Sequence, residues 1–228
     1  MIHLKYHQTL FDMRIISAIL ILSVWACQSP SGERAVTGEA ENPQLTTGEY
    51  VTYSVDLENS NIEWIGARPA SQHNGIVSIK EGHLNINDGE IAGGEFVIDL
   101  TDITVLDITD PARNARLKRH LESDDFFDVE NHPEARFVIT SVEELQNAAS
   151  GLTHRITGNL LMRGRDRAVT FDAAVDINDE NIGARSVQFL INRTEWGVNY
   201  QSRTIFGSVL DNFILDDIAL VVNLTASR

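Results

Sequence analysis

The stretch from Val169 to Asn178, VTFDAAVDIN, alternates apolar and polar residues over nearly all of its length. In an extended chain, successive side chains point to opposite faces, so the apolar set falls on one face: Val169, Phe171, Ala173, Val175 and Ile177. This alternation predicts a strand with one buried and one solvated face, which favours an antiparallel sheet.

The same pattern recurs along most of the chain after Tyr50. GEFVIDL, SVQFLIN and NFILDDIALVVNL alternate in the same way, and Gly, Asn and Asp separate the runs. Further strands are expected at Val51–Leu57, Ile62–Ala67, Gly75–Lys80, His83–Asn87, Ala135–Val142 and His154–Arg163. Gly93, Gly94 and Gly164 are interpreted as bulge or turn positions.

One helix is predicted. Asp110 can cap it, Pro111 fits its first turn, and Ala112 to Leu121 contains no helix breaker. Eight or more one-sided strands with one helix leave two architectures, a two-sheet sandwich or a closed barrel, and periodicity does not separate them. A barrel of eight strands can leave room for one small ligand.

The N-terminus has the pattern of an export signal. The apolar run Ile15–Ala26 is shorter than the ~20 residues that span a bilayer and leads directly to the only cysteine, Cys27. This arrangement resembles a bacterial lipobox, whose cysteine is acylated and becomes the first mature residue, although Trp25 departs from the usual pattern. The alternative is an ordinary signal peptide with an unmodified cysteine. Translation can begin at Met1 or at Met13.

Gln28–Gly48 is polar and aperiodic, and we expect it to be a flexible tether. The predicted organisation is therefore a lipoprotein signal peptide at 1–26, an acylated cysteine and tether at 27–49, and a barrel at 50–228. We expect the protein to be located in the bacterial cell envelope, as a periplasmic or outer-membrane lipoprotein.

Composition excludes several classes of function. The formal net charge of −15 argues against nucleic acid and anionic lipid surfaces as partners. No motif combines a nucleophile with a base, and chance carboxylate pairs carry little information among 33 acidic residues, so no catalytic site is expected. The seven histidines show no metal-ligand spacing, so no metal site is expected, although one assembled across strands stays open.

Four segments, in order, resemble the YceI-like family, lipocalin-like bacterial proteins that bind polyisoprenoids and other long-chain lipids. They are HNGIVSIKEGHLNINDGEIAGGEFVIDLTDI, LKRHLESDDFFDVENHPEARFVITS, ITGNLLMRGRDRAVTF and INRTEWGV. The resemblance covers about Tyr50 to Arg228. The third segment departs from the family's usual hairpin because GRDRAV lacks a proline.

The resemblance implies an all-β fold, an extended eight-stranded antiparallel lipocalin-like barrel with one short α-helix and a long apolar tunnel. The expected ligand-binding residues are Trp64, Phe96, Ile98, Phe126, Phe127, Phe137, Ile139, Leu160, Phe171, Phe189, Ile191, Arg193, Trp196 and Leu220.

Two roles stay open for each of three of these residues, and for one histidine near them in the sequence. Phe126 and Phe127 either close the tunnel end or belong to an ordinary core. Arg193 either meets a polar lipid head or forms a salt bridge at the barrel mouth. His120 either hydrogen-bonds a loop carbonyl or contacts a ligand head group.

The expected function is to sequester or transport one long-chain isoprenoid lipid, such as a quinone or prenyl carrier, without a cofactor. One alternative is a structural or interaction lipoprotein whose barrel is filled by its own side chains. Another is an enzyme acting on a lipid-like substrate. The oligomeric state is open, with a homodimer as one alternative.

Overall fold

The computed structural model describes residues 29–43, 48–146, 151–207 and 212–228. The predicted signal peptide and Cys27 lie outside the described residues. Twelve strands form one sheet: β1 (Glu33–Arg34), β2 (Val36–Glu39), β3 (Val51–Val55), β4 (Asn61–Arg68), β5 (Ser71–Asn87), β6 (Glu90–Val105), β7 (Glu134–Glu144), β8 (His154–Met162), β9 (Arg165–Ile177), β10 (Asn181–Ser186), β11 (Phe189–Asn192) and β12 (Asp217–Ser227).

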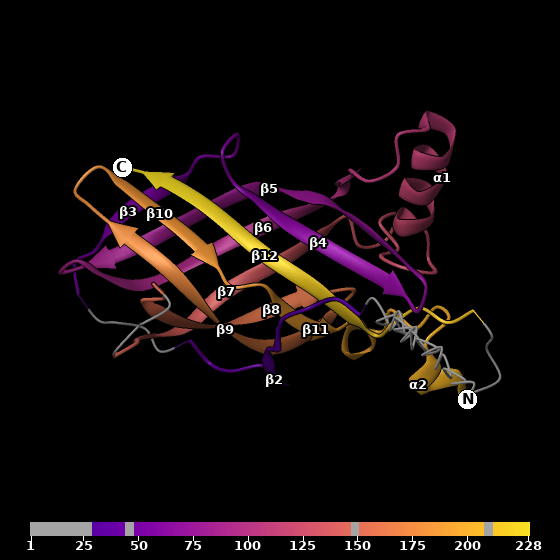
Figure 1. Cartoon of the computed structure of the whole chain (residues 1–228). Helices are drawn as coiled ribbons and strands as arrows, with labels where there is room; N and C mark the ends of the chain where they lie inside the picture. Colours follow the sequence, from indigo (N-terminus) through magenta and orange to yellow (C-terminus); the bar gives the residue numbers. More distant parts are fainter. Residues whose placement is uncertain (1–28, 44–47, 147–150, 208–211) are drawn as a thin grey trace, which may run out of the picture.

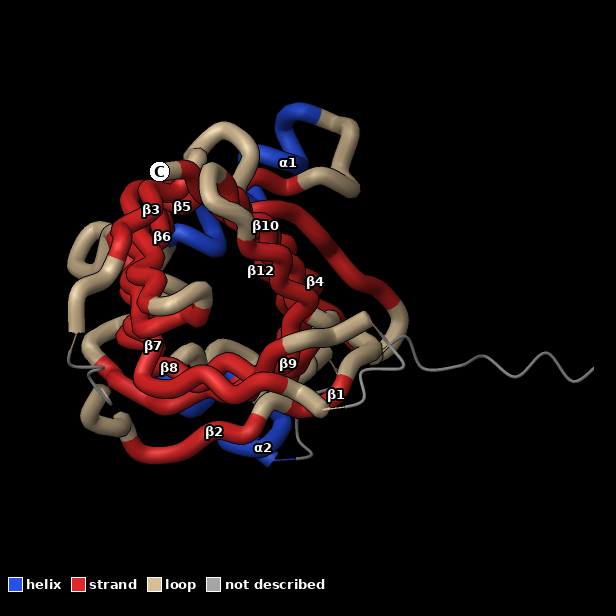
Figure 2. The backbone as a smooth tube through the Cα atoms, turned by 90° about the vertical axis from the view of Figure 1, so that its left-hand side faces the viewer, coloured by secondary structure: helices blue, strands red, loops and turns tan. Residues whose placement is uncertain are grey.

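Eight of these strands close into a ring. The order is β4, β5, β6, β7, β8, β9, β10, β12 and back to β4, and every neighbouring pair is antiparallel. Figure 2 shows the ring nearly end on, with an open centre in the backbone. The all-β, eight-stranded antiparallel barrel is therefore confirmed, and the sandwich alternative is wrong.

Two tight hairpins set the register of the long strands. The β5–β6 turn places Asp88 and Gly89 at φ 51° and 87°, and the β8–β9 turn places Arg163 and Gly164 at φ 48° and 70°. Positive φ at both central residues matches the twist of the flanking strands. The register also shifts between Asn85 and Ile86 opposite Gly93, which confirms a bulge there.

The helices lie at one end of the barrel, which we call the helical end (Figure 1). Helix α1 (Pro111–Glu122) begins at Asp110, whose side chain accepts a hydrogen bond from the Arg113 N–H at 2.8 Å, and it buries Leu121. A 3-10 helix (Arg193–Trp196) and the short helix α2 (Arg203–Phe206) were not predicted. No helix in the described ranges is long and apolar enough to cross a membrane.

The opposite end, which we call the β3 end, has an extra strand in the wall of the barrel and a cluster of buried side chains. Strand β3 pairs with both β5 and β12. The Tyr53 hydroxyl lies 3.2 and 3.1 Å from the carbonyl oxygens of Asn178 and Asp179. The Tyr53 side chain therefore connects β3 to the turn between β9 and β10. Ile86 and Ile182 are buried beside it.

The prediction of a flexible tether is wrong for Glu33–Glu39, which we call the N-terminal strap. Its first strand runs parallel to β11 and its second antiparallel to β9. Between them Ala35 is buried, and its N–H donates to the Leu190 carbonyl at 2.9 Å. The strap therefore lies in the sheet between β9 and β11, but its strands of two and four residues are too short for a period-2 signal in the sequence.

Removing residues 28–42 tests whether the strap belongs to the fold. Loss of its backbone ladder and of buried Ala35 should lower the melting temperature by about 4–8 °C, the equivalent of ~2 kcal/mol for a domain of this size. Thermal unfolding of domains beginning at residue 28 and at residue 43 measures the difference. Equal melting temperatures would restore the tether interpretation.

Candidate ligand-binding tunnel

The barrel encloses two apolar chambers that join end to end. The chamber toward the β3 end has a cavity volume of about 120 Å³, and the chamber toward the helical end has a cavity volume of about 150 Å³. We call them the inner and outer chambers. One buried water needs roughly 10–15 Å³ on this measure, so the lumen is not a filled core.

Both chambers share one narrow set of side chains, which we call the waist: Ile62, Ile98, Leu160, Ile191 and Leu220. These residues come from five different strands around the barrel. Because the same five residues border each chamber, the chambers are neighbours along the barrel axis, with only this set of side chains between them.

Aromatic rings form one wall of the inner chamber. Phe96, Phe137, Phe171 and Phe189 follow one another with centroid separations of 6.5, 5.9 and 4.6 Å, and the last two are stacked. A Cβ on Gly158 would lie 2.4 Å from the Phe137 ring, so only glycine lets that ring lie against β8. The absent side chain at Gly158 therefore makes room for Phe137 within the wall.

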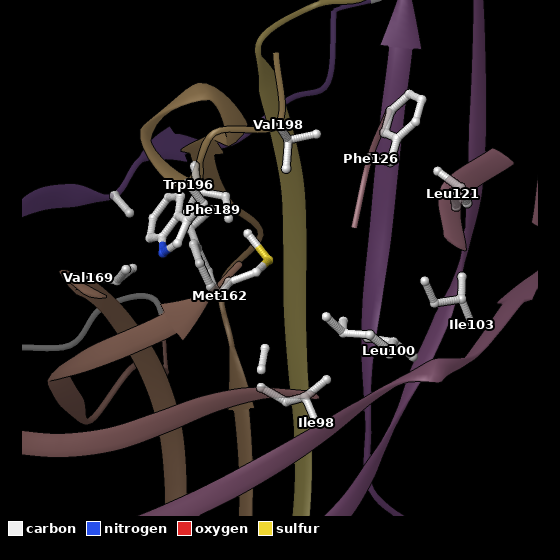
Figure 3. Close-up of a cluster of buried hydrophobic side chains, with 14 of the residues drawn as sticks. Ile98, Leu100, Ile103, Leu121, Phe126, Met162, Val169, Phe189, Trp196 and Val198 are labelled. Atoms are coloured by element: carbon white, nitrogen blue, oxygen red, sulfur yellow. The ribbon is translucent and has the colours of Figure 1, made fainter. Parts of the chain in front are cut away.

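The outer chamber ends at the loop after α1. Ile98, Leu100, Ile103, Leu121 and Phe126 lie along one side of it (Figure 3). Phe126 is 7% exposed, and its ring packs against His120 and Tyr200 at 4.9 and 5.5 Å. Phe127, half-buried, lines the same chamber. Phe126 is therefore both core and tunnel wall, which combines the two alternatives.

A surface groove lies on the other side of that wall. The groove and the outer chamber share Trp64, Gly66, Leu121, Phe126 and Ile214. At the helical end a single layer of side chains therefore separates the outer chamber from the surface. His120 borders this groove and pairs with Asp125 at 3.1 Å rather than with a loop carbonyl.

Arg193 is buried at the outer end of the tunnel, with 1% exposure. Its guanidinium donates to the carbonyls of Val198, Ile214 and Leu215 at 2.6, 3.2 and 3.2 Å, and to the Asp216 carboxylate at 3.3 Å. Burial lowers the pKa of Arg193, and Asp216 opposes that shift. The salt-bridge alternative is confirmed, because four of its five N–H groups bind the protein.

The prediction for Trp196 is wrong, because its side chain lines neither chamber. Trp196 is fully buried near Val169, Met162 and Phe189, at the left of Figure 3 and across the cluster from Phe126. Its Nε1 donates to the Leu160 carbonyl at 2.9 Å. The chain turns into a 3-10 helix at Arg193, so the strand alternation that placed Ile191 in the lumen no longer applies.

The other thirteen predicted residues line a chamber: Trp64, Phe96, Ile98, Phe126, Phe127, Phe137, Ile139, Leu160, Phe171, Phe189, Ile191, Arg193 and Leu220. Several lining residues were not predicted, among them Ile62, Leu84, Ile156, Leu100, Ile103 and Met162. For Ile62, Leu100, Ile156 and Met162 strand parity was the available signal, because each shares its parity with a predicted residue on the same strand. Parity did not point to Leu84 or Ile103.

The lining offers little for chemistry. In the inner chamber the one polar side chain is Ser186, whose hydroxyl accepts from the Val222 N–H at 2.8 Å. In the outer chamber the polar groups are Arg193 and Trp64, whose buried Nε1 has no hydrogen-bond partner among the described residues. Such walls exclude water and bury an apolar chain, and their polar groups do not combine a nucleophile with a base.

One cluster outside the tunnel has metal-ligand chemistry. Glu90, Glu144 and His154 bring one ligand atom each within 4.8 Å of one another across β6, β7 and β8. The two glutamates are exposed, and His154 Nδ1 lies 2.7 Å from the Thr153 hydroxyl. Residue spacing missed this group because its members come from three strands.

A closed antiparallel barrel around two neighbouring apolar chambers defines a lipocalin-like barrel protein. The chain belongs to the YceI-like domain family, whose model matches residues 53–226.

Relatives and solved structures agree with this assignment. A UPF0312 protein of Pseudomonas putida is 27% identical over 124 residues, which cover 53% of this chain and 60% of that protein. A UPF0312 protein of Staphylococcus epidermidis is 25% identical over 145 residues, 59% of this chain and 78% of that protein. The chain thus spans about 60% of the length of the Pseudomonas relative.

Two solved structures share the fold. BcnA of Burkholderia cenocepacia superimposes with a TM-score of 0.57 at 19% identity, covering 76% of this chain and 99% of BcnA. A polyisoprenoid binding domain from Saccharophagus degradans, implicated in plant cell wall breakdown, gives a TM-score of 0.54 at 16% identity. That match covers 77% of this chain and 98% of that domain.

Replacing Leu160 at the waist with Trp should separate the two chambers. We expect the Leu160→Trp protein to lose binding of long isoprenoids that occupy both chambers, while a short terpene that fits one chamber still binds. The matched control is Leu161→Trp, because Leu161 is 40% exposed and faces outward on the same strand. Native mass spectrometry with a chain-length series measures both. An equal loss of long-isoprenoid binding in the two variants would contradict the role of the waist between the chambers.

Proposed function

We propose that this protein binds one long-chain apolar lipid, a polyisoprenoid or quinone-like molecule, along its tunnel. The observation that carries the proposal is the pair of neighbouring apolar chambers that share the waist, lined by apolar side chains apart from Ser186, Trp64 and Arg193 in the described part of the chain. The Saccharophagus degradans domain of the same fold, described as polyisoprenoid binding, supports it.

The energetics favour a long chain over a compact ligand. Each methylene moved from water into the lumen contributes about 0.8 kcal/mol, and ordering of the chain offsets part of that gain. An elongated tunnel with apolar walls gives this contribution at every position along its length. In this proposal binding energy accumulates with ligand length, and polar contacts at the ends adjust it.

The alternative of a structural lipoprotein with a filled barrel predicts a lumen closed by its own side chains. The two chambers argue against it, since each has room for several water-sized spheres. In our proposal the protein is not an enzyme, and it sequesters the lipid or carries it within the cell envelope as a lipoprotein held by acylated Cys27.

Extraction of the purified protein tests lipid binding. We expect solvent extraction and mass spectrometry to yield close to one isoprenoid per chain from the wild type and from Leu161→Trp, and much less from Leu160→Trp. An empty wild-type protein that also takes up no added isoprenoid would favour the structural alternative. A bound molecule that is converted during incubation would favour the enzyme.

Acylation of Cys27 is tested separately. Cys27→Ser should leave the protein unprocessed or move it from the membrane fraction to the soluble fraction, because two acyl chains hold far more strongly than one or none. Fractionation and the mass of the mature N-terminus measure this outcome. A mature wild-type protein with a free thiol in the soluble fraction would contradict the lipoprotein proposal.

A further inference from the structure

The N-terminal strap leaves very little chain between the anchor and the barrel. Gln188 Nε2 donates to the Ser31 carbonyl and hydroxyl at 2.5 and 2.8 Å, and β1 begins at Glu33. Ser29 is the first described residue. In the sequence only Gln28 stands between Ser29 and Cys27, and two residues of extended chain span at most about 7 Å.

This short connection begins at the helical end of the barrel. Ser29 and Pro30 border a surface hollow together with Arg203 and Thr204 of α2. The same hollow includes Ile214 and Leu215, which also line the outer chamber. The anchor is therefore attached beside the end of the tunnel that a single layer of side chains closes.

The surface around that point is amphipathic. Ile205 and Phe206 of α2 are adjacent in sequence and are 51% and 56% exposed. The Arg203 guanidinium lies 5.1 Å from the Phe213 ring centroid. Apolar tips next to arginine are the composition of a surface that rests in a lipid headgroup region.

The charges next to α2 are paired or positive. Asp216 pairs with Arg193, and Asp217 pairs with Arg34 at 2.5 Å. Arg68 and Arg203 have no carboxylate within 4.0 Å in the described part of the chain. The chain as a whole carries −15, so the surface it fits is a zwitterionic bilayer rather than an anionic one.

We propose that the helical end is a membrane-docking face, in which Ile205 and Phe206 enter the headgroup region of the bilayer that holds the acylated Cys27. This inference rests on the proposed function. It adds an orientation, with the thin-walled end of the tunnel facing the bilayer and the β3 end facing away. A lipid then passes between bilayer and tunnel without crossing water.

The orientation can be measured on the full, acylated chain. Acylation consumes the Cys27 thiol, so Thr204→Cys on α2 and Glu180→Cys at the β3 end each carry one free thiol for an environment-sensitive fluorophore. In phosphatidylcholine vesicles, doxyl-labelled lipids should quench the label at position 204 and not the label at position 180. Equal quenching, or quenching at position 180 alone, would overturn the docking face.

The functional consequence is tested by Ile205→Ser with Phe206→Ser. Transfer of anthraniloyl-geranylgeraniol from vesicles to the anchored protein should slow on the order of tenfold, the equivalent of ~1.4 kcal/mol in the barrier. Occupancy after loading in detergent should stay unchanged. The matched control is Val51→Ser with Leu57→Ser, two exposed apolar residues at the β3 end, which should transfer at the wild-type rate.

The outcomes separate the two proposals. Equal transfer rates for both double variants and the wild type would overturn the docking face while leaving lipid binding and anchoring intact. A chain that is not acylated, or that binds no anthraniloyl-geranylgeraniol in detergent, would overturn the proposed function before any vesicle is added.

Discussion

The pairing of β4 with two neighbours at once is the constraint on which the molecule depends. Strand β4 pairs with eight residues of β5 along one edge and with five residues of β12 along the other, and these pairings close the ring. A closed ring has no unpaired edge, and its strand number fixes the interior width. Every second side chain must then point into a space of set diameter, whether or not those side chains can fill it.

Closure also explains how much the sequence could predict. Inside the ring the pleat controls side-chain direction, so alternation in VTFDAAVDIN and its counterparts indicated lumen-facing residues such as Phe96, Phe171 and Phe189. Phe126 and Phe127 lie in a loop, and only the family resemblance pointed to them. Alternation fails where the pleat ends, as at Trp196 in the 3-10 helix. The strands of the N-terminal strap are too short for alternation to show. The sequence also did not reveal that Ser186–Asn192 spans the end of β10 and the whole of β11.

The two ends of the barrel are built on different principles. At the β3 end, an extra strand pairs with β5 and β12, and the Tyr53 hydroxyl donates to carbonyls of the turn between β9 and β10. At the helical end, strands give way to loops and short helices that need other support. Arg193 supplies it by holding Val198 and the Ile214–Asp216 segment through four hydrogen bonds. A buried cation is costly unless it is paired, so this end depends on one fully engaged side chain.

An apolar lumen that its own side chains leave unfilled has a thermodynamic consequence. Its walls lack the dispersion contacts that a packed core provides, and an apolar cavity gives water few hydrogen-bond partners. An apolar molecule that enters restores those contacts and adds its own desolvation, so it acts as the missing part of the core and stabilises the folded state. Because the contacts are non-directional, what they select is the length and cross-section of the molecule. The ring fixes the cross-section at the waist, so ligand choice follows from barrel geometry.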